Sequence, residues 1–437
     1  MAYTEKVMEL LEKRLTRQLA TYLHVCAHCG ACAESCHYYK ALGEPEMVPA
    51  YKTDLLRKIY KGKYDVMASK IPGWFGGVQN VDEDYIKRMV DGAYGSCTLC
   101  RRCTVNCPMG IDTGMIMRVT RAILTDLGLT PAGLRATIDV HYEHGNNMAV
   151  TREELIDTLE WMEEELQEDL DDPTAKIPYD KKGVRMIYTV NPREAKYSPL
   201  SIKAAAKIYH AAGENWCVST DSWDTTNYAM FSGEDAKAKK NSQELANAAL
   251  SLGAEEVVMA ECGHGYRVFR WEGENWLGKN YGVKVRHFNE LMAEYIREGR
   301  IQLDPSKHQE LITYHDPCSQ GRNGGVFDEP RYILSKAVTN FKEMTPHGKE
   351  NFCCGAGSGM LTMSEYNKRR LAASEIKANQ IRETGAATVA TSCHNCLDGL
   401  HEGTKHHKVD VHIKNLVEII ADALIMPEKK NNEKEEE

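Results

Sequence analysis

Two cysteine runs with the same spacing constrain this chain more than any other feature. Residues 26 to 36 read CAHCGACAESC and residues 97 to 107 read CTLCRRCTVNC, so each run has the pattern C-x2-C-x2-C-x3-C. The chain holds 15 cysteines in 437 residues. Its first 19 residues mix acidic and basic side chains and lack a signal-peptide apolar core with a cleavage site, which predicts a cytoplasmic protein. Since disulfides rarely persist there, the cysteines favour metal or redox chemistry.

Length, charge and hydropathy narrow the class of protein further. A chain of 437 residues is too long for one ordinary core and predicts two or three domains. No apolar run reaches the roughly 20 residues that a spanning helix requires, so we expect no membrane span. The formal net charge of -9 and the absence of a basic stripe argue against nucleic-acid binding.

Each cysteine run matches a ferredoxin signature, and Pro108 follows the second run. In that signature three closely spaced thiolates hold one 4Fe-4S cubane and the fourth reaches the other cubane. Zinc is the alternative, but zinc sites pair two C-x2-4-C knuckles and do not need four cysteines in each run. The spacing therefore predicts two ligand sets that exchange their fourth members. The first set is Cys26, Cys29, Cys32 and Cys107, and the second is Cys97, Cys100, Cys103 and Cys36.

A helical domain is predicted around these runs. About 60 residues separate them, and this insert has helical apolar spacing before a Pro/Gly break at residues 71 to 77. We predict an α-helical ferredoxin-like domain with two 4Fe-4S clusters at residues 1 to 135. Residues 136 to 180 are predicted to be a helical linker, because they include the strongly acidic amphipathic stretch 151 to 176, which is typical of a solvated connector.

From residue 181 the pattern changes to short β-rich runs that alternate with helices, and it occurs twice. The segments YTVNPR, ENWCVS and ECGHGY align with TYHDPC, ENFCCG and SCHNCL further along the chain. We predict two pseudo-symmetric α/β lobes, a degenerate lobe at residues 181 to 304 and a complete lobe at residues 305 to 425. The fold class is thus α+α/β. The alignment pairs Arg193 with Cys318, Cys217 with Cys353, Val218 with Cys354, Cys262 with Cys393 and Gly265 with Cys396.

The two predicted lobes differ in their thiols. The first retains only two at the aligned positions, whereas 4Fe-4S clusters normally take about four cysteine ligands, so we expect iron in the second lobe alone. Cys217 and Cys262 are interpreted as small buried apolar residues. The five thiols of the second lobe are Cys318, Cys353, Cys354, Cys393 and Cys396.

The order C-x34-CCG-x37-C-x2-C from Cys318 to Cys396 resembles the CCG domain of the catalytic subunits of heterodisulfide reductase. Two 4Fe-4S runs ahead of two such lobes are similar to the D-type subunits of that family, so the resemblance covers nearly the whole chain. It implies a non-cubane 4Fe-4S cluster on the five thiols, at which a disulfide is cleaved, and three 4Fe-4S clusters in all. The residues alone leave two alternatives: a vicinal disulfide or buried thiols at Cys353 and Cys354, and a zinc knuckle or dithiol at Cys393 and Cys396.

Arg193, Val218 and Gly265 depart from the family members that carry two CCG clusters. With one complete site, the chain resembles the Hdr-like catalytic subunits of sulfate-reducer membrane complexes, which are linked to sulfite reductase or to a transmembrane cytochrome. This resemblance implies a peripheral subunit on the cytoplasmic face of the cell membrane, with a cytochrome b-type partner and other redox subunits. It also implies an oxidoreductase that reduces or forms a disulfide or trisulfide on a small sulfur-carrier protein with C-terminal cysteines.

Cleavage of a disulfide produces thiolates, so proton donors or positive charge are expected beside the cluster. His315, Arg322 and His394 lie within a few residues of predicted ligands, and His264 follows Cys262 in the first lobe. Histidine can deliver a proton near neutral pH and arginine can hold an anionic sulfur. The alternative is that each side chain only hydrogen-bonds its loop or a cluster sulfide.

Two other functions stay open at this point. One is an electron-transfer subunit that serves a flavin-dependent dehydrogenase of glycolate, lactate or glycerol 3-phosphate. The other is a non-enzymatic scaffold in which the CCG segment holds structural zinc or a disulfide. The C-terminal residues 426 to 437, which end in PEKKNNEKEEE, are of low complexity and are predicted to be disordered.

Overall fold

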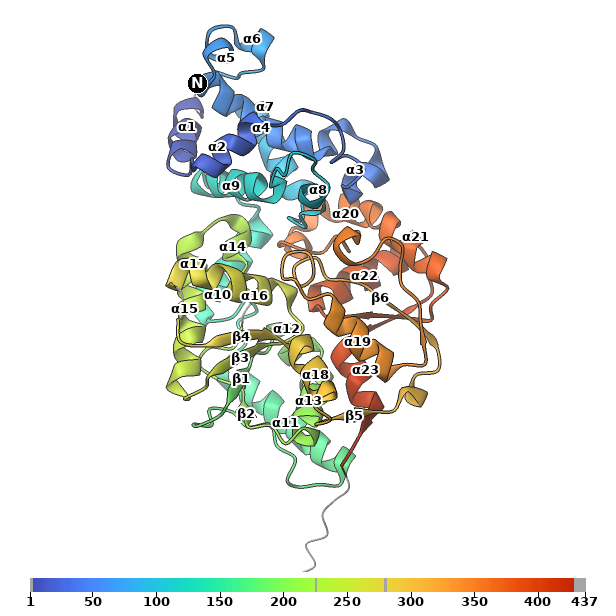
Figure 1. Ribbon diagram of the computed structural model, residues 1–437. Coiled ribbons are helices and arrows are strands. Elements are labelled where there is room, and N and C mark those ends of the chain that lie inside the picture. The colour runs from blue at the N-terminus through green and yellow to red at the C-terminus, as the bar shows by residue number, and fades with distance from the viewer. Residues whose placement is uncertain (1–2, 225, 279–280, 428–437) are drawn as a thin grey trace, which may run out of the picture.

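The computed structural model describes residues 3–224, 226–278 and 281–427 of the chain. A helical N-terminal domain lies at one end of the molecule, and two α/β lobes lie side by side beneath it (Figure 1). Helices followed by parallel sheets confirm the expected α+α/β fold class. Of the tail predicted to be disordered, the part from residue 428 onward lies outside the described residues.

The helical domain is organised around its longest helix, α4. This helix begins at Pro49, whose fixed φ suits the first helical position and whose missing N–H costs nothing there. Its apolar side, which includes Leu55 and Leu56, is buried, and the helix packs against α9. The helices of this domain are α1 (Thr4–Glu12), α2 (Arg17–His24), α3 (His37–Leu42), η1 (Pro45–Met47), α4 (Pro49–Tyr64), α5 (Val66–Lys70), α6 (Pro72–Phe75), α7 (Glu83–Val90), η2 (Asp91–Gly95), α8 (Arg102–Val105) and α9 (Thr113–Asp126).

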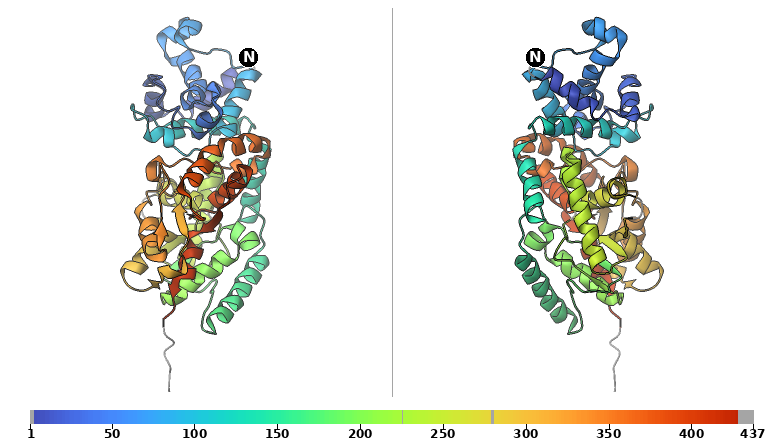
Figure 2. Two further views of the ribbon diagram at one scale, coloured as in Figure 1. Left: turned by 90° about the vertical axis from the view of Figure 1, so that its right-hand side faces the viewer. Right: turned by 90° about the vertical axis from the view of Figure 1, so that its left-hand side faces the viewer.

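Two helices, α10 (Ala132–His144) and α11 (Arg152–Leu170), connect this domain to the lobes and descend along one flank of the molecule (Figure 2). A capping box between Thr151 and Glu154 starts α11 and satisfies two backbone N–H groups. The helix is amphipathic, as its sequence indicates. Its apolar side, which includes Leu155 and Leu159, is buried in the largest hydrophobic core and the helix packs against α13, so the connector is also part of the lobes' core.

The first lobe is built on a four-stranded parallel sheet with the strand order β2-β1-β3-β4. Its two central strands are buried along their whole length because helices cover both faces, as is usual for parallel sheets. The elements of this lobe are β1 (Met186–Tyr188), α12 (Pro192–Tyr197), α13 (Leu200–Ala211), β2 (Trp216–Cys217), α14 (Ala229–Ser232), α15 (Asp235–Ser251), β3 (Glu256–Met259), α16 (Gly263–Arg267), η3 (Val268–Glu272), α17 (Gly273–Leu277), β4 (Lys284–His287) and α18 (Phe288–Arg297).

The second lobe repeats this topology. Its sheet has the order β7-β6-β8-β9, again with parallel neighbours, and a short antiparallel pair of β5 with β10 lies apart from it. Its elements are β5 (Gln302–Leu303), η4 (Pro305–Lys307), β6 (Leu311–Tyr314), α19 (Asp328–Ala337), β7 (Asn340–Phe341), η5 (Gly348–Glu350), η6 (Met360–Thr362), η7 (Ser364–Tyr366), α20 (Asn367–Ala373), α21 (Glu375–Thr384), β8 (Thr388–Thr391), α22 (His394–His406), β9 (His412–Asn415), α23 (Leu416–Ala423) and β10 (Leu424–Ile425).

The contacts between the lobes have the same pseudo-symmetry as the sheets. Helix α13 packs against α23, and α18 packs against α19. Since α13 and α19 each follow the first strand of their sheet, while α18 and α23 each follow the fourth, the two contacts are equivalent. The lobes are thus related by an approximate two-fold axis, which supports the inferred duplication.

A single buried arginine joins the helical domain to both lobes. Arg121 of α9 is fully buried, and its guanidinium donates to the carbonyls of Ala93 (2.9 Å) and Cys97 (2.7 Å) in its own domain. It also donates to the carbonyl of Phe231 in the first lobe and to that of Ser358 in the second, each at 3.0 Å. Because a buried guanidinium needs all its partners, this network fixes the position of the three parts relative to one another.

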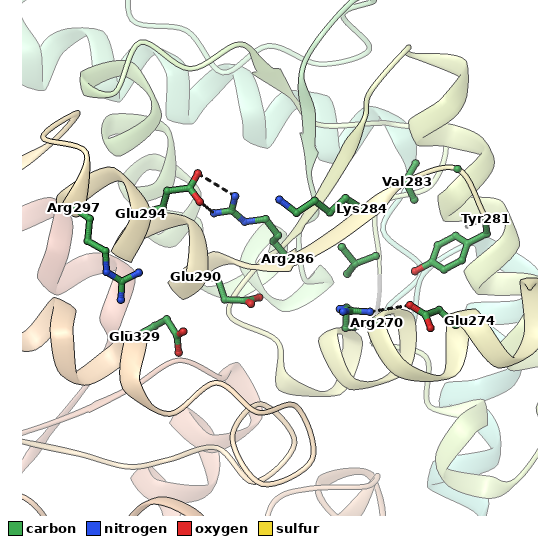
Figure 3. A pocket seen from close by; sticks show the side chains of 12 residues that line it. Arg270, Glu274, Tyr281, Val283, Lys284, Arg286, Glu290, Glu294, Arg297 and Glu329 are labelled. Carbon is green, nitrogen blue, oxygen red and sulfur yellow. Dashed lines mark hydrogen bonds and ion pairs between the residues drawn. The ribbon is translucent and has the colours of Figure 1, made fainter. Parts of the chain in front are cut away.

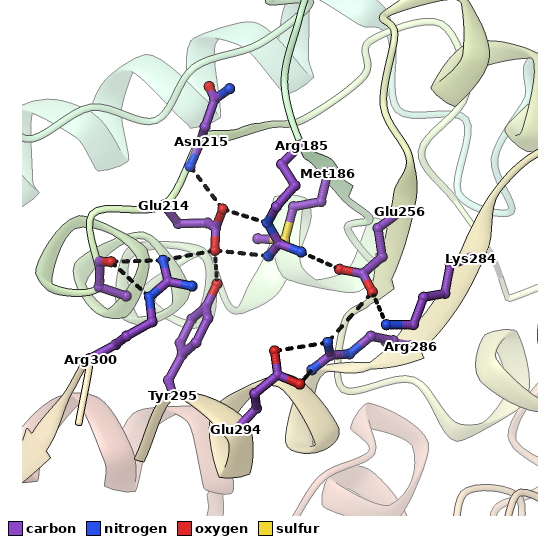
Figure 4. A network of polar contacts seen from close by, with 11 residues as sticks. Arg185, Met186, Glu214, Asn215, Glu256, Lys284, Arg286, Glu294, Tyr295 and Arg300 are labelled. Carbon is purple, nitrogen blue, oxygen red and sulfur yellow. Dashed lines mark hydrogen bonds and ion pairs between the residues drawn. The ribbon is translucent and has the colours of Figure 1, made fainter. Parts of the chain in front are cut away.

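The outer edge of the first lobe carries a network of ion pairs, which Figure 4 shows. Arg185 contacts both Glu214 (2.8 Å) and Glu256 (2.5 Å), and Arg300 and Tyr295 also donate to Glu214. Burial opposes ionisation of Glu214, but Arg185 and Tyr295 outweigh it and lower the pKa of this carboxyl to about 2. The network therefore holds a buried negative charge in place.

An open groove of about 770 Å³ lies beside edge strand β4, and no cysteine lines it (Figure 3). Arg286 pairs with Glu294 and Arg270 with Glu274 along its wall, so its charges are largely matched within the protein. In the part of the chain that the structure describes, no helix combines the length and apolar character needed to cross a bilayer.

Candidate metal centres

The five thiols of the complete lobe meet at the carboxyl edge of its parallel sheet. Cys318 follows β6, Cys393 and Cys396 lie at the N-terminal end of α22 after β8, and Cys353 and Cys354 arrive on the loop before η6. All five are buried, with at most 8% of any residue exposed. The fold therefore brings together residues that are up to 78 positions apart in sequence, from Cys318 to Cys396.

The contacts between these thiols form a continuous cluster. The Sγ atoms of Cys354 and Cys396 are 3.4 Å apart. The Cys353 thiol is hydrogen-bonded to Cys318 and Cys354, and the Cys393 thiol to Cys396. The five thiols, with one ring nitrogen of His315 beside two of them, form a sulfur-rich donor set, and thiolates are the main ligands of iron-sulfur clusters.

The glycine of the CCG segment makes this geometry possible. Gly355 has a φ of +87°, a left-handed conformation that residues with a Cβ rarely adopt. The turn directs the Gly355 N–H back at Cys353 Sγ, 3.3 Å away. Such a hydrogen bond stabilises a thiolate, and hydrogen bonds to sulfur are one way a protein tunes a cluster's potential. The adjacent cysteines therefore present both thiols at one point.

His315 is the predicted acid-base residue that lies closest to the thiols. One of its ring nitrogens and the sulfurs of Cys354 and Cys396 lie within 4.8 Å of one another. The ring is fully buried, the Cys354 thiol lies against it, and among the described residues no nitrogen or oxygen atom is hydrogen-bonded to either ring nitrogen. Burial, together with the charge of Lys377, lowers the pKa of His315. A buried ring that makes no hydrogen bond to nitrogen or oxygen is costly, which fits a site that receives a further group.

Lys377 of α21 is a second titratable nitrogen group at this site, and sequence reasoning missed it. It is 2% exposed and its Nζ donates to Asn351 Oδ1 at 2.6 Å, beside the CCG segment. Burial lowers the pKa of Lys377 to about 7, although Asp316 and the thiolates of Cys354 and Cys353 act in the opposite direction. Nothing in the local sequence KANQ separates this lysine from a surface one, because its burial depends on the packing of α21.

His264 reaches the site from the first lobe, but its ring is fully engaged. Its Nε2 accepts the Ser358 N–H at 3.1 Å, and its Nδ1 lies 2.8 Å from the side-chain amide of Asn395. Burial, with the charge of Arg267, lowers the pKa of His264 to about 4. The structure faces Asn395 Nδ2 toward His264 Nδ1. Since Nε2 accepts, the neutral ring carries its proton on Nδ1, so the Asn395 amide must be turned by 180° for its oxygen to accept that proton. At neutral pH His264 thus positions the CCG loop.

His394 contacts the other lobe. Its Nε2 lies 3.2 Å from Glu194 Oε1 in α12, and both side chains are 1% exposed. Burial opposes the charged form, but the Glu194 carboxylate outweighs it and raises the pKa of His394. This buried ion pair fixes the start of α22, and therefore Cys393 and Cys396, against the first lobe.

Arg322 holds two cysteine segments together. Its guanidinium donates to three backbone carbonyls: Cys100 at 2.9 Å, Lys349 at 2.7 Å, and Asn351. Because Cys100 belongs to the second ferredoxin run and Asn351 precedes Cys353, the arginine ties the helical domain to the CCG loop. The N–H groups of Arg322 are thus engaged by backbone carbonyls. This corresponds to the alternative stated from the sequence, in which the side chain only hydrogen-bonds its loop.

One predicted cubane set lines a common cavity. Cys36, Cys97, Cys100 and Cys103 all border it, so the fourth cysteine of the first run does lie with the first three of the second. Lys52 of α4 also borders the cavity, with Nζ 3.7 Å from Cys36 Sγ and 2.6 Å from the Ser96 carbonyl. A cavity lined by four thiols from both runs is the geometry that an exchanged cubane requires.

The other predicted set is nearer the surface. Burial raises the pKa of Cys32, and Cys26 and Cys107 add to this rise, so Cys107 is near enough to Cys32 for their charges to interact. Cys29 is exposed. The guanidinium of Arg57, which is 2% exposed, is hydrogen-bonded to Cys26. The exposed edge of this set makes it the more accessible of the two.

The helical domain and the CCG site meet through sulfur. The thiol of Cys100 lies against that of Cys353, and the Thr98 hydroxyl lies 3.4 Å from the same Cys353 Sγ. Cys100 also packs against the hydrophobic cluster that surrounds the CCG thiols. A predicted ligand of the second cubane therefore touches a predicted ligand of the third cluster.

The two cysteines of the first lobe have different surroundings. Cys262 caps α16 and accepts the Gly265 N–H at 3.4 Å, and its position after β3 is equivalent to that of Cys393 after β8. Cys217 lies in β2, which flanks β1 as β7 flanks β6. Since β7 ends at Phe341, well before the CCG segment, the alignment of Cys217 with Cys353 is wrong. The local similarity between the segments ENWC and ENFC produced this incorrect alignment.

Comparison with known proteins agrees with this arrangement. Residues 22–111 match the 4Fe-4S dicluster domain family, and residues 312–400 match the CCG family, a cysteine-rich domain. The chain is 26% identical over 468 aligned residues to the Hdr-like menaquinol oxidoreductase iron-sulfur subunit 2 of Archaeoglobus fulgidus, which covers 97% of this chain and 83% of that protein.

A second relative is the D-type subunit of the dihydromethanophenazine:CoB--CoM heterodisulfide reductase from Methanosarcina barkeri. It is 27% identical over 419 residues, covering 94% of this chain and 96% of that protein. The probable iron-sulfur-binding oxidoreductase FadF of Bacillus subtilis is 26% identical over 356 residues, covering 78% of this chain and 48% of that protein.

The chain therefore contains a segment that matches a 4Fe-4S dicluster domain and, after it, a segment that matches a CCG cysteine-rich domain, two domain types that indicate 4Fe-4S clusters. It resembles, over most of its length, both the iron-sulfur subunits of Hdr-like menaquinol oxidoreductases and the D-type subunits of heterodisulfide reductases. The resemblance that the cysteine motifs indicate is thus confirmed.

Proposed function

We propose that this chain is the iron-sulfur subunit of an Hdr-like membrane redox complex that passes electrons through two cubanes to a third, non-cubane 4Fe-4S cluster. The cubanes are assigned to Cys26, Cys29, Cys32 and Cys107, and to Cys97, Cys100, Cys103 and Cys36. The third cluster is assigned to Cys318, Cys353, Cys354, Cys393 and Cys396. At this cluster a disulfide or trisulfide is reduced or formed, and the substrate is a small sulfur-carrier protein.

The observation that carries this proposal is the contact of Cys100 with Cys353. It gives the three ligand sets an order: the surface set with the exposed Cys29, then the cavity set, then the five buried thiols. Five sulfur donors exceed the four of a zinc site, so the donor set favours iron over structural zinc. A structural disulfide would leave the other three thiols and His315 without a role.

Reduction of a disulfide consumes two electrons and two protons, breaks one S–S bond and yields two thiols. An iron-sulfur cluster, when bound, supplies electrons singly and offers iron to sulfur. The protein's contribution is the polar surroundings: His315 and Lys377 place N–H groups and positive charge beside the thiols, where thiolate products need them. His264, His394 and Arg322 hold the surrounding loops in position.

The relatives' names guide the assignment of partners. The relatives named as menaquinol oxidoreductase subunits act in Hdr-like complexes. By analogy, we place this chain on the cytoplasmic face of the cell membrane, beside a cytochrome b-type subunit that supplies or receives electrons. The first cubane, with its exposed Cys29, is the entry point in this scheme.

The test is anaerobic reduction of a disulfide by the full chain with reduced methyl viologen as donor. A peptide with two C-terminal cysteines, oxidised to its internal disulfide, serves as the probe. We expect two viologen cations oxidised per disulfide broken, loss of this activity in Cys318→Ala, and full activity in the matched variant Cys217→Ala, whose thiol lies in β2. Equal rates in wild type and Cys318→Ala would refute the proposal and favour a chain that only transfers electrons.

A further inference from the structure

A small apolar protrusion at the tip of the helical domain has no role in the site described above. Residues 65 to 77, which we call the finger, include α5 and α6 and extend from the end of the molecule opposite the C-terminal side (Figure 1). Trp74 is 89% exposed, more than any other large hydrophobic residue of the described chain. Five apolar side chains of the finger are exposed: Val66, Met67, Ile71, Trp74 and Phe75.

The finger is firmly folded, so this exposure is built into the structure. Asp65 caps α5 by accepting the N–H groups of Met67 (3.0 Å) and Ala68 (2.9 Å). Two glycines close its base: a Cβ on Gly62 would lie 2.3 Å from the Val78 carbonyl oxygen, and one on Gly77 would lie 2.7 Å from that of Ala68. The backbone segments therefore touch directly, and the apolar side chains are held outward.

The finger and the end of α4 that precedes it carry a positive net charge, whereas the net charge of the whole protein is negative. Residues 58 to 77 contain four lysines and one aspartate, a net charge of +3 in a chain whose net charge is -9. Lys58, Lys63 and Lys70 are exposed; Lys63 forms an ion pair with Glu12 of α1, whereas no ion pair is found for Lys58 or Lys70 among the described residues. Exposed aromatic and aliphatic side chains surrounded by lysines match the interfacial region of an anionic bilayer, where apolar groups enter the acyl boundary and lysines meet phosphate.

We propose that the finger inserts its apolar tip into the surface of an anionic lipid bilayer. The shape favours lipid over a protein partner, because two helices of five and four residues form a convex tip without an extended face. Tryptophan is the side chain most typical of the bilayer interface, and such apolar groups penetrate about 5–10 Å. The lysine stems can reach back to the headgroups while their methylenes remain in the apolar layer.

Docking in this way would bring the first cubane near the membrane. Helix α4 carries Arg57, which is hydrogen-bonded to Cys26, and it ends at Tyr64 beside the finger. Asp65 lies eight positions after Arg57, and an α-helix rises 1.5 Å per residue, so the two are about 12 Å apart along the helix axis. This consequence for electron entry rests on the proposed function, whereas lipid binding itself does not depend on it.

The experiment is co-sedimentation of the full, anaerobically prepared chain with vesicles. Vesicles of phosphatidylglycerol and phosphatidylcholine in equal amounts are compared with pure phosphatidylcholine. We expect binding to the anionic vesicles only, weakened at least about tenfold in Trp74→Ala/Phe75→Ala because two apolar side chains no longer insert. Lys58→Gln/Lys70→Gln should also weaken it. The matched control is Trp161→Ala, which removes a tryptophan that is 53% exposed on α11, and should bind as wild type does.

Iron content and viologen-linked disulfide reduction are measured on the same variants and should not change, because the finger lies outside the cysteine sites. Absence of wild-type binding to anionic vesicles would overturn the proposal and leave the finger as a contact for a protein subunit. Binding that is equal in wild type and Trp74→Ala/Phe75→Ala would overturn it as well. Neither result would bear on the clusters, so failure of this proposal is distinguishable from failure of the proposed function.

Discussion

Lys52 should raise the reduction potential of the second cubane, and its removal tests the electrostatics of that site. The side chain is 3% exposed, and its Nζ lies 3.7 Å from Cys36 Sγ. At an effective dielectric constant of about 20, opposite unit charges at this distance attract by about 4 kcal/mol. The added electron resides mainly on iron, which is further from Nζ than the sulfur is. We therefore take about half of this attraction energy, or about 2 kcal/mol, as the effect of Lys52 on reduction. For one electron this corresponds to about 80 mV, since 59 mV equals about 1.4 kcal/mol.

We therefore expect Lys52→Met to lower the potential of one cubane by about 80 mV, because the reduced cluster loses a nearby positive charge. The assay is an EPR-monitored redox titration of the anaerobic protein, with iron content as a check that the cluster is intact. Lys52→Arg keeps the charge and should shift the potential much less, and Lys58→Met removes an exposed lysine on the same helix as a control. An unchanged potential in Lys52→Met with full iron content would refute this reasoning.

Three further outcomes follow from the structure. Arg121→Met should destabilise the protein by about 3 kcal/mol or more, because four buried carbonyls lose their donor; thermal unfolding of the variant measures this loss. Glu214 has a pKa of about 2 in the folded state, below its ordinary value of 4.5, because Arg185 and Tyr295 outweigh burial. Its contribution to stability is full above pH 4.5 and is lost as pH falls toward 2, so urea unfolding of Glu214→Gln should show a weaker pH dependence over that window. Gly355→Ala should reduce the iron bound at the CCG site and lower the melting temperature, because alanine at a φ of +87° is strained by about 1 kcal/mol or more; iron content equal to wild type would contradict this.

Cysteine spacing could propose the candidate centres because ligand spacing is a local property of the chain. The exchange of Cys36 and Cys107 followed from the ferredoxin signature, and the cavity shared by Cys36, Cys97 and Cys100 has the expected members. The duplicated α/β topology was also readable, since strand and helix patterns recur along the sequence. The fold class is confirmed by the two parallel sheets.

Roles that depend on tertiary packing were not readable. Lys377 is an ordinary helix residue in sequence, and only the packing of α21 buries it beside the CCG loop. The Arg322 guanidinium binds backbone carbonyls of two domains, a contact that no local pattern encodes. The misalignment of Cys217 has the same origin. It followed the similarity of the four-residue segments ENWC and ENFC, whereas the position of Cys217 in β2 is seen only in the folded sheet.

The most direct test of the central claim is iron and acid-labile sulfide per chain, with EPR spectra, on anaerobic wild type and on Cys353→Ala/Cys354→Ala. Three clusters predict about 12 iron atoms in wild type and about 8 in the variant, with loss of one distinct EPR signal. Cys217→Ala, which changes a thiol in β2, should retain about 12. About 8 iron atoms in both wild type and the double variant would contradict the account, because the five buried thiols would then hold no iron.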